Sequence, residues 1–295
     1  MTSSRIRPSA WQPAGPDRRP AAGPDELAAA AELLRGLPWF ALTGAGISTD
    51  SGIPDYRGPD SPPRTPITYQ QFVADPAFRR HYWARNHYGW HHVGRVAPNA
   101  GHRALAELER RGIVLGVITQ NVDLLHQQAG SRRVIDLHGH YNEVACLSCG
   151  HRVSRAELDT RLVALNPGFL ERVEEIADVE IAPDADAVIE QTEGFVVADC
   201  EVCGGVLKPD IVYFGETVPA DRVAEAYALV DRSEALVVAG SSLAVMSGLR
   251  FVRHAASAGK PVVIINRGLT RGDQYATLRL NAGTSQALGY LVQHL

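Results

Sequence analysis

The stretch Leu37-Pro38-Trp39-Phe40-Ala41-Leu42-Thr43, followed at once by Gly44-Ala45-Gly46, decides the fold of this chain. A short apolar run of this length is typical of a buried β-strand, and glycines at its end let backbone N–H groups approach a phosphate group. The turn alone is a weak signal, because Thr49 stands where a third glycine is usual. A tight turn without any ligand explains it equally well.

On either side of this run, short apolar segments alternate with helical ones. Such alternation predicts an α/β fold with a Rossmann-like, doubly wound parallel sheet. The expected strands are Leu37–Thr43, Ile113–Thr119, Val134–Leu137, Ala235–Ala239 and Pro261–Asn266. The expected helices are Glu26–Arg35 with Asp25 as its N-cap, Gly101–Arg111, Leu124–Gln128, Ala220–Leu229, Met246–Ala258 and Ser285–His294.

Two segments interrupt the alternation and predict a smaller, zinc-binding domain inserted beside the sheet. We assign residues 25–52, 104–138 and 211–295 to the Rossmann-like domain and residues 53–103 and 139–210 to the small domain. Residues 153–198 are expected to be mostly helical. Residues 1–24 are rich in proline and arginine without apolar periodicity, which indicates a disordered N-terminal tail.

The four cysteines of the chain form two matched C-x-x-C pairs, Cys146 with Cys149 and Cys200 with Cys203. Four thiolates complete a tetrahedral shell, which predicts one structural Zn²⁺ with no open position for chemistry. Two redox dithiols or two disulfides are the alternative, less favoured because such motifs rarely occur as a matched pair.

The composition of the chain indicates which classes of partner and which cellular compartment to expect. A formal net charge of -4 argues against direct nucleic-acid binding by bulk electrostatics. No apolar run approaches the roughly 20 residues that span a bilayer, and no leader pattern opens the chain, so we expect no membrane association. Thiolate ligation of zinc requires reduced cysteines, which favours a cytoplasmic location.

Two further strand ends carry small or hydrogen-bonding residues, Gly240-Ser241-Ser242 and Asn266-Arg267-Gly268. Ligands of open α/β folds bind at the carboxyl ends of the strands. Three such ends together favour a nucleotide crevice over three unrelated turns. The loop Gly52-Ile53-Pro54-Asp55-Tyr56-Arg57-Gly58 suits a lid that closes over the ligand, with Arg57 on phosphate oxygens, although a plain connector explains it equally well.

Polar groups also follow the strands at 113–119 and 134–137, namely Gln120-Asn121-Val122-Asp123 and His138-Gly139-His140. An imidazole is the natural general base near neutral pH, which makes His138 the candidate base. A structural or metal-binding histidine is the alternative, for which His140 and His151 near the cysteines are better placed. Asp123 is also a plausible helix N-cap.

In this order, the motifs resemble the sirtuin family over roughly residues 26–295. The resemblance rests on Gly44–Ser48, Gly52–Arg57, Thr119–Asp123, His138-Gly139, the cysteine pairs, Pro209–Glu216 and Gly240–Ser242. Tyr56 and the segment Tyr82–Asn86 look most like the class II, mitochondrial-type branch and its bacterial relatives.

The resemblance implies an NAD-dependent protein lysine deacylase with NAD as consumed co-substrate and acyl-lysine proteins as partners. His138 would be the base and Asn121 a second catalytic residue. Val212, Phe214, Gly215 and Glu216 would bind the substrate peptide as an added strand. The implied NAD-binding residues are Gly44, Ala45, Gly46, Ile47, Ser48, Thr49, Asp50, Ser51, Gly52, Ile53, Pro54, Asp55, Tyr56, Arg57, Gln120, Asn121, Val122, Asp123, Gly240, Ser241, Ser242, Asn266, Arg267, Gly268 and Thr284.

By the same resemblance, the acyl oxygen attacks the nicotinamide ribose and the products are nicotinamide, free lysine and O-acyl-ADP-ribose. Transfer of ADP-ribose to protein and a non-catalytic NAD-sensing scaffold are the alternative functions. The chain lacks a clear Tyr-x-x-Arg pair of the kind that selects acidic acyl groups, so succinyl-lysine is not favoured. Tyr82, Trp83, Tyr88 and Trp90 either bound the acyl channel or belong to the core, with the core favoured.

Overall fold

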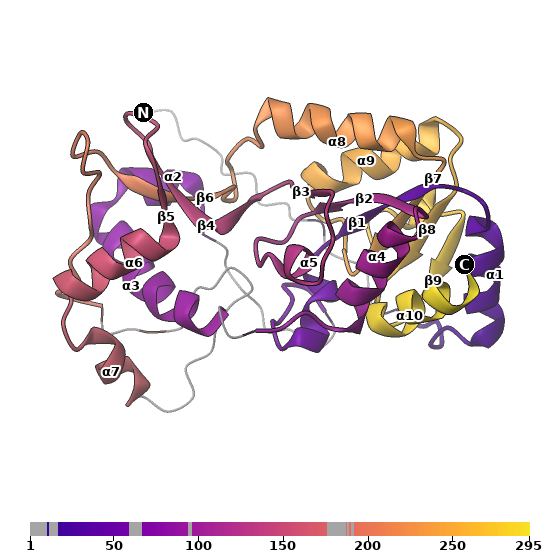
Figure 1. The fold of residues 1–295 in the computed structure, drawn as a ribbon, viewed down its shortest axis with the longest axis horizontal. Helices are drawn as coiled ribbons and strands as arrows, with labels where there is room; N and C mark the ends of the chain where they lie inside the picture. Colours follow the sequence, from indigo (N-terminus) through magenta and orange to yellow (C-terminus); the bar gives the residue numbers. More distant parts are fainter. Residues whose placement is uncertain are drawn as a thin grey trace.

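The computed structural model describes residue 11 and residues 17–58, 67–93, 96–175, 187, 189 and 192–295. These residues form a six-stranded parallel sheet and a three-stranded antiparallel sheet, each with its own helices (Figure 1). The predicted α/β class with a Rossmann-like sheet is confirmed. No helix of the described residues is long and apolar enough to cross a membrane.

The order of strands in the large sheet reverses at its centre. From β1 the chain adds β2 and β3 on one side and later β7, β8 and β9 on the other. Ligands of open α/β sheets bind at the carboxyl edge where the order reverses, here between β1 and β7. In spatial order the strands are β3 (Val134–Asp136), β2 (Val114–Thr119), β1 (Trp39–Thr43), β7 (Ala235–Ala239), β8 (Val262–Ile265) and β9 (Leu278–Leu280).

Strand β1 is apolar along its length because both of its faces are buried. Trp39 and Ala41 belong to the core on one face of the sheet, and Phe40 and Leu42 to the core on the other. The first core is closed by α1 (Pro24–Leu34), α4 (Ala100–Arg110) and α10 (Thr284–His294), and the second by α8 (Ala220–Arg232) and α9 (Met246–Ser257) (Figure 1).

The three-stranded sheet has a separate core. Tyr82, Trp83 and Tyr88 are buried in it, so the interpretation of these aromatic residues as core is the correct one. The predicted domain boundaries themselves stay a prediction. The elements of this part are α2 (Tyr69–Ala74), α3 (Pro76–Val93), β4 (Gly139–Cys146), β5 (Arg152–Ser154), α6 (Arg155–Leu165), α7 (Phe169–Glu174) and β6 (Leu207–Ile211).

The first helix begins earlier than the sequence predicted. Gly23, not Asp25, is its N-cap, and the Glu26 side chain accepts a hydrogen bond of 2.8 Å from the Gly23 backbone N–H. Pro24 suits the first helical position because it has no N–H to satisfy. Asp25 lies in the first turn, where its negative charge is favourable.

Short helical turns connect the sheet to the loops at its carboxyl edge. Helix α5 begins at Leu125 rather than Leu124, because Leu124 is left-handed with φ 60°. The N-cap is therefore Leu124 and not the predicted Asp123, although Asp123 Oδ1 accepts a hydrogen bond of 3.0 Å from the Leu125 N–H. The turns are η1 (Ala45–Ile47), η2 (Thr49–Ser51), α5 (Leu125–Gln128) and η3 (Asp273–Tyr275).

The predicted N-terminal tail lies largely outside the described residues, but its last part packs against the large sheet. Ala22 is buried and its N–H donates to the Asn281 carbonyl at 2.9 Å. Asp17 pairs with Arg279 at 2.7 Å. Residues 17–22 therefore belong to the folded structure and not to a disordered tail, because a buried ion pair and a backbone hydrogen bond hold them in place. Residues 176–186 of the expected helical segment also lie outside the described residues.

Candidate active site

Two turns meet at the point where the strand order reverses. The Gly44 N–H donates to the Ala239 carbonyl at 3.3 Å, and the Gly46 N–H donates to the Gly240 carbonyl at 2.8 Å. Gly240 has φ 67°, and a Cβ at this position would lie 2.3 Å from the Ile47 nitrogen. Only glycine fits, so the loops after β1 and β7 pack backbone against backbone.

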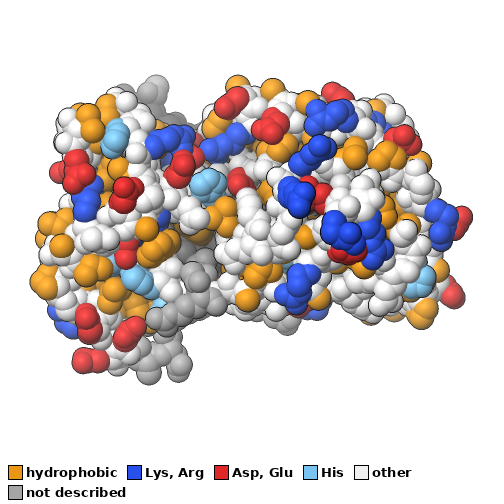
Figure 2. Space-filling model, in the orientation of Figure 1, with side chains coloured by type: hydrophobic (Ala, Val, Ile, Leu, Met, Phe, Trp, Pro, Cys, Tyr) orange, Lys and Arg blue, Asp and Glu red, His pale blue; other side chains and the backbone are white. Residues whose placement is uncertain are grey.

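A cavity of about 1070 Å³ opens at this edge, between the parts that contain the two sheets. Figure 2 shows the surface narrowed and hollowed between these parts. Most of the predicted site residues line it. They are Gly44, Ala45, Gly46, Ser48, Ile53, Asp55, Tyr56, Arg57, Gln120, Asn121, Val122, Asp123, His138, Val212, Phe214, Gly215, Glu216, Gly240, Ser241, Ser242, Asn266, Arg267 and Gly268.

Some predicted NAD-binding residues do not line the cavity. Ile47 is fully buried in the core, and Asp50 and Ser51 line a shallow depression beside the start of α4. Thr284 is buried, whereas its neighbour Gly283 faces the cavity. The remaining positions outside the lining are Thr49, Gly52 and Pro54.

His138 is held at both ring nitrogens. Its Nδ1 lies 2.9 Å from the Gln120 carbonyl and its Nε2 lies 2.8 Å from the Ser247 hydroxyl. A carbonyl only accepts, so Nδ1 carries the proton and Nε2 presents a lone pair. Burial lowers the pKa of His138 to about 4, and the charge of Arg222 acts in the same direction. The ring is therefore neutral near pH 7 and able to accept a proton at Nε2.

The carboxamide of Asn121 is fixed beside the first glycine turn. Its Nδ2 donates to the Gly44 carbonyl at 3.2 Å and to Ser48 Oγ at 3.0 Å, and Ser48 Oγ donates to Asp123 Oδ2 at 2.7 Å. Burial raises the pKa of Asp123, while the hydrogen bond from the Leu125 N–H opposes the rise. These three side chains form a rigid polar wall of the cavity.

The loop after Ile53 reaches the cavity from the other side. The Asp55 carboxylate accepts hydrogen bonds from the N–H groups of Arg57, at 3.2 Å, and Gly58, at 2.6 Å. Tyr56 packs edge-on against Phe214, with ring centroids 6.3 Å apart. Arg57 faces the cavity, where burial lowers the pKa of its guanidinium. The loop thus places one cation in the cavity that the glycine turns also line.

The segment after β6, which contains the predicted peptide-binding residues, is anchored by a buried lysine. Lys208 Nζ donates to the Ile211 carbonyl at 2.5 Å and pairs with Glu216 at 3.2 Å. The Val212 N–H donates to the His138 carbonyl at 2.7 Å. The segment that is predicted to bind the peptide is therefore tied directly to His138.

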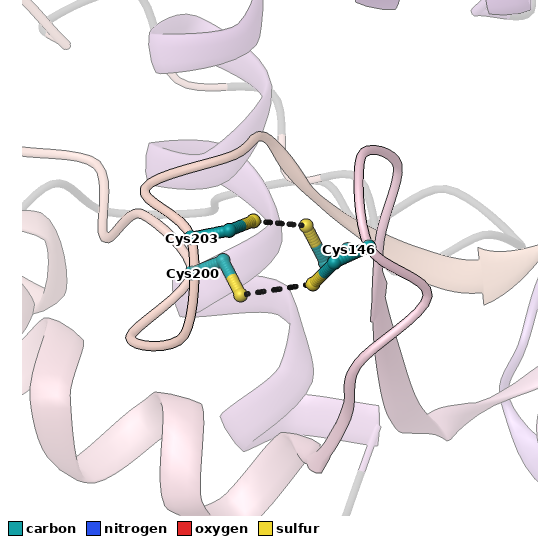
Figure 3. Close-up of side chains that lie close together, drawn as sticks. Cys146, Cys200 and Cys203 are labelled. Atoms are coloured by element: carbon teal, nitrogen blue, oxygen red, sulfur yellow. Dashed lines mark hydrogen bonds between the residues drawn. The ribbon is translucent and has the colours of Figure 1, made fainter.

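The four cysteines come together in the part that contains the three-stranded sheet, and none of them is among the residues that line the cavity. Figure 3 shows the side chains of two loops facing one another. The Cys146 and Cys203 sulfurs are 3.5 Å apart and those of Cys149 and Cys200 are 3.8 Å apart, with all four cysteines free. A tetrahedral zinc with bonds of about 2.3 Å separates its sulfurs by about 3.8 Å, so the set fits one Zn²⁺.

The thiolate state that zinc requires is already favoured at one cysteine. The backbone N–H groups of Cys149 and Ser148 lower the pKa of Cys146 to about 6. His140 and His151 are not members of the four-cysteine cluster among the described residues. The disulfide alternative is excluded for these free thiols, and the structural zinc site is the interpretation that the geometry supports.

Comparison with known proteins identifies the family. Residues 44–247 match the sequence model of the Sir2 family. The matched region includes both glycine turns, His138 and all four cysteines. The chain belongs to the Sir2 family. The predicted sirtuin resemblance is confirmed, and its placement in the class II branch stays a prediction.

Bacterial relatives match this sirtuin over most of its length. It is 62% identical over 263 residues to NAD-dependent protein deacetylase 1 of Mycobacterium avium (strain 104), covering 89% of this chain and 93% of the relative. It is 51% identical over 294 residues to NAD-dependent protein deacetylase 1 of Streptomyces coelicolor (strain ATCC BAA-471 / A3(2) / M145), covering 99% and 96%.

Solved structures share the same fold. The structure of Sir2 with a p53 peptide and NAD⁺ is 31% identical with a TM-score of 0.70, covering 90% of this sirtuin and 97% of that chain. The structure of Sir2Tm bound to a propionylated peptide is 29% identical with a TM-score of 0.69, covering 91% and 98%.

Sequence reasoning missed several residues of the cavity. Ser247 contacts His138. Its position in the first turn of α9, which begins at the carboxyl edge of the sheet, could have indicated that its hydroxyl faces the cavity. Asp17 and Ala21 also line the cavity, but they follow a proline-rich stretch that gave no sign of order. Gln286 in α10 was missed although it is two residues after the predicted Thr284, because it belongs to no motif.

Proposed function

We propose that this sirtuin removes acyl groups from lysine side chains of proteins and consumes NAD in doing so. The observation that carries the proposal is His138, neutral, with its Nε2 lone pair at a cavity formed where the order of strands reverses. A volume of about 1070 Å³ is at the upper end for ligand pockets and accommodates a dinucleotide together with an acylated side chain.

NAD would supply the ADP-ribosyl group that accepts the acyl group. The reaction consumes one water and yields nicotinamide, free lysine and O-acyl-ADP-ribose. The turns Gly44–Gly46 and Gly240–Ser242 present backbone groups to the pyrophosphate, and Arg57 adds a positive charge. Asn121 and Asp123 bind the nicotinamide amide. His138 Nε2 removes a proton from a ribose hydroxyl, which makes its oxygen nucleophilic.

Backbone pairing with the segment Val212–Glu216 explains how a protein substrate binds, since an extended peptide adds to an exposed strand edge without a fixed sequence. Apolar side chains, among them Ile67, Val122 and Ile211, line the same cavity and suit a short apolar acyl group. We therefore propose acetyl-lysine as the first substrate, in keeping with the names of the bacterial deacetylases that the chain resembles.

Reduced cysteines in the zinc set favour the cytoplasm as the compartment. The bacterial relatives agree with such a location. We propose protein substrates as the partners, with no direct role for nucleic acid or membrane.

The test is incubation of the protein with NAD and a panel of acetyl-, propionyl- and succinyl-lysine peptides, with products identified by mass spectrometry. His138→Ala is expected to lower deacylation by about 100-fold or more, the usual contribution of a general base. His254→Ala, which changes an exposed histidine that pairs with Asp231, is the control.

Other products would support one of the alternative functions. Labelled protein without O-acyl-ADP-ribose would indicate an ADP-ribosyltransferase, and no nicotinamide release with any peptide would indicate an NAD-sensing scaffold. Wild-type turnover in His138→Ala would overturn the assignment of the base.

A further inference from the structure

A cluster of possible metal ligands lies in the part of the molecule that contains the three-stranded sheet, outside the NAD cavity and the four-cysteine set. His87 and His91 are four residues apart on α3, a spacing that places both imidazoles on one helix face. Asp159 comes from α6, which packs in the same part (Figure 1). Two histidines at this helical spacing and a third ligand from another element are a common arrangement for zinc.

The distances between the ligand atoms suit one ion. His87 Nδ1 lies 2.9 Å from Asp159 Oδ1, and His91 Nε2 lies 3.2 Å from Asp159 Oδ2. The three candidate ligand atoms all lie within 4.8 Å of one another. In a tetrahedral site with bonds of about 2.0–2.1 Å, neighbouring ligand atoms are about 3.3 Å apart. An ion therefore fits after small movements of the side chains.

His87 makes no hydrogen bond that would explain its position. Its side chain is fully buried, and neither ring nitrogen has a hydrogen-bond partner within the described ranges. The short contact of Nδ1 with Asp159 lacks hydrogen-bond geometry. A buried polar group without a partner is costly, and a metal ion on Nδ1 removes that cost.

We propose that His87, His91 and Asp159 bind a second divalent transition-metal ion of the zinc class, which ties α3 to α6. Three protein ligands leave a fourth position for water, and the His91 side chain, 32% exposed, lies at the solvent side. The site is separate from catalysis and stabilises the helices of this part.

One neighbouring charge opposes the ion. Arg155 Nη1 lies 3.5 Å from Asp159 Oδ1, while its guanidinium also lies over the Trp90 ring, 4.8 Å from the centroid. A cation this close weakens metal affinity, so the site is expected to be weaker than the four-cysteine site. Zinc at the cysteines should survive treatments that empty the histidine site.

The test uses the full chain without a polyhistidine tag, equilibrated with micromolar Zn²⁺ and then freed of unbound metal on a desalting column. Elemental analysis is expected to give two Zn²⁺ per wild-type chain and one for His91→Gln and for His87→Gln/His91→Gln. The matched control is His92→Gln on the same helix, which should keep two. Because His91 is partly exposed, its variant separates loss of metal from loss of folding, as checked by circular dichroism.

Cobalt gives an independent readout. Co²⁺ added to protein whose cysteine site holds zinc should give the weak visible bands of nitrogen and oxygen ligands in the wild type and His92→Gln, and none in His91→Gln. Three results would overturn the proposal: one Zn²⁺ in the wild type, a second Zn²⁺ that persists in the double variant, or thiolate charge-transfer bands from the added Co²⁺. Each would leave the three side chains as a cluster of ion pairs without metal.

Discussion

The Ser247 hydroxyl is the contact that sets the direction of the His138 ring together with the Gln120 carbonyl. Because the Gln120 carbonyl fixes the proton on Nδ1, the Ser247 hydroxyl donates to Nε2, the nitrogen that we propose as the base. Ser247 is a positioning residue: its hydroxyl holds the ring in place and gives way when a substrate hydroxyl reaches Nε2.

At this scale we expect Ser247→Ala to lower kcat for deacylation by about threefold to tenfold, the cost of one neutral hydrogen bond. The KM for NAD should change little, since the glycine turns are untouched. Steady-state kinetics check both values, with Ser257→Ala at the exposed end of α9 as the control. An unchanged kcat in Ser247→Ala would show that Gln120 alone orients the ring.

At the scale of single elements, the segment after β6 depends on Lys208. Its ammonium also contacts the Pro209 carbonyl, at 3.2 Å, and lies 4.8 Å from the centre of the Tyr213 ring. One side chain thus fixes the end of the strand and the turn that follows, which together form the peptide-binding edge.

Lys208→Met removes the charge and keeps most of the apolar stem. We expect the KM for an acetyl-lysine peptide to rise by about tenfold, because loss of charge-assisted hydrogen bonds of about 1.5–3 kcal/mol releases the turn. The KM for NAD should stay near the wild-type value. Lys260→Met is the matched control, since Lys260 also donates to backbone carbonyls but at the end of α8. Equal effects of both variants on peptide KM would contradict this role.

The four-cysteine site stabilises the same edge from its other end. Cys146 is the last residue of β4 and pairs with Leu207, the first residue of β6. Cys203→Ser should therefore lower the zinc content by one ion and reduce kcat/KM for peptide by more than tenfold, without direct contact with the cavity. Zinc analysis and peptide kinetics check this expectation. Full activity in a variant that lacks the thiolate-bound ion would show that β4 and β6 hold their register without metal.

At the scale of the whole molecule, buried neutral histidines make stability depend on pH. His102 has no exposed surface, and burial lowers its pKa to about 4. Burial also lowers the pKa of His126 well below its usual value. The unfolded chain binds protons at both histidines below about pH 6.5. The folded chain binds a proton at His102 only near pH 4, so stability falls as the pH falls through this window.

For His102 alone, the free energy of unfolding should decrease by about 2 kcal/mol between pH 7 and pH 5. Urea unfolding at a series of pH values measures this slope, and His102→Gln should make it shallower. A slope that is the same in the variant would show that His102 does not titrate on unfolding.

The alternation of apolar runs with helical segments predicted the large sheet well. The strand expected at Ala235–Ala239 has these bounds in the structure, because both of its faces are buried and turn residues follow it. The position of Gly23 as N-cap was missed, since the proline that follows it was assigned to a tail. A local apolar pattern predicts such a strand because every residue of a strand that is buried on both faces must be apolar.

The sequence also indicated His138 and the four cysteines as candidate site residues, because a general base and a zinc site need those residue types at those places. The supporting contacts were not. Ser247 meets His138 over a separation of more than 100 residues, and the Asp17–Arg279 pair spans almost the whole chain. Such pairs depend on how the elements pack, which no local pattern records.

The central pairing of β1 with β7 has a consequence for how this protein is made. Its partners, Trp39 and Ala235, are about 200 residues apart in the chain, a long loop whose closure is entropically costly and slow. During synthesis the first three strands leave the ribosome long before the fourth member of the central sheet exists. NAD can bind only after β1 and β7 have paired. Cellular NAD therefore stabilises the completely folded protein and does not stabilise the nascent chain.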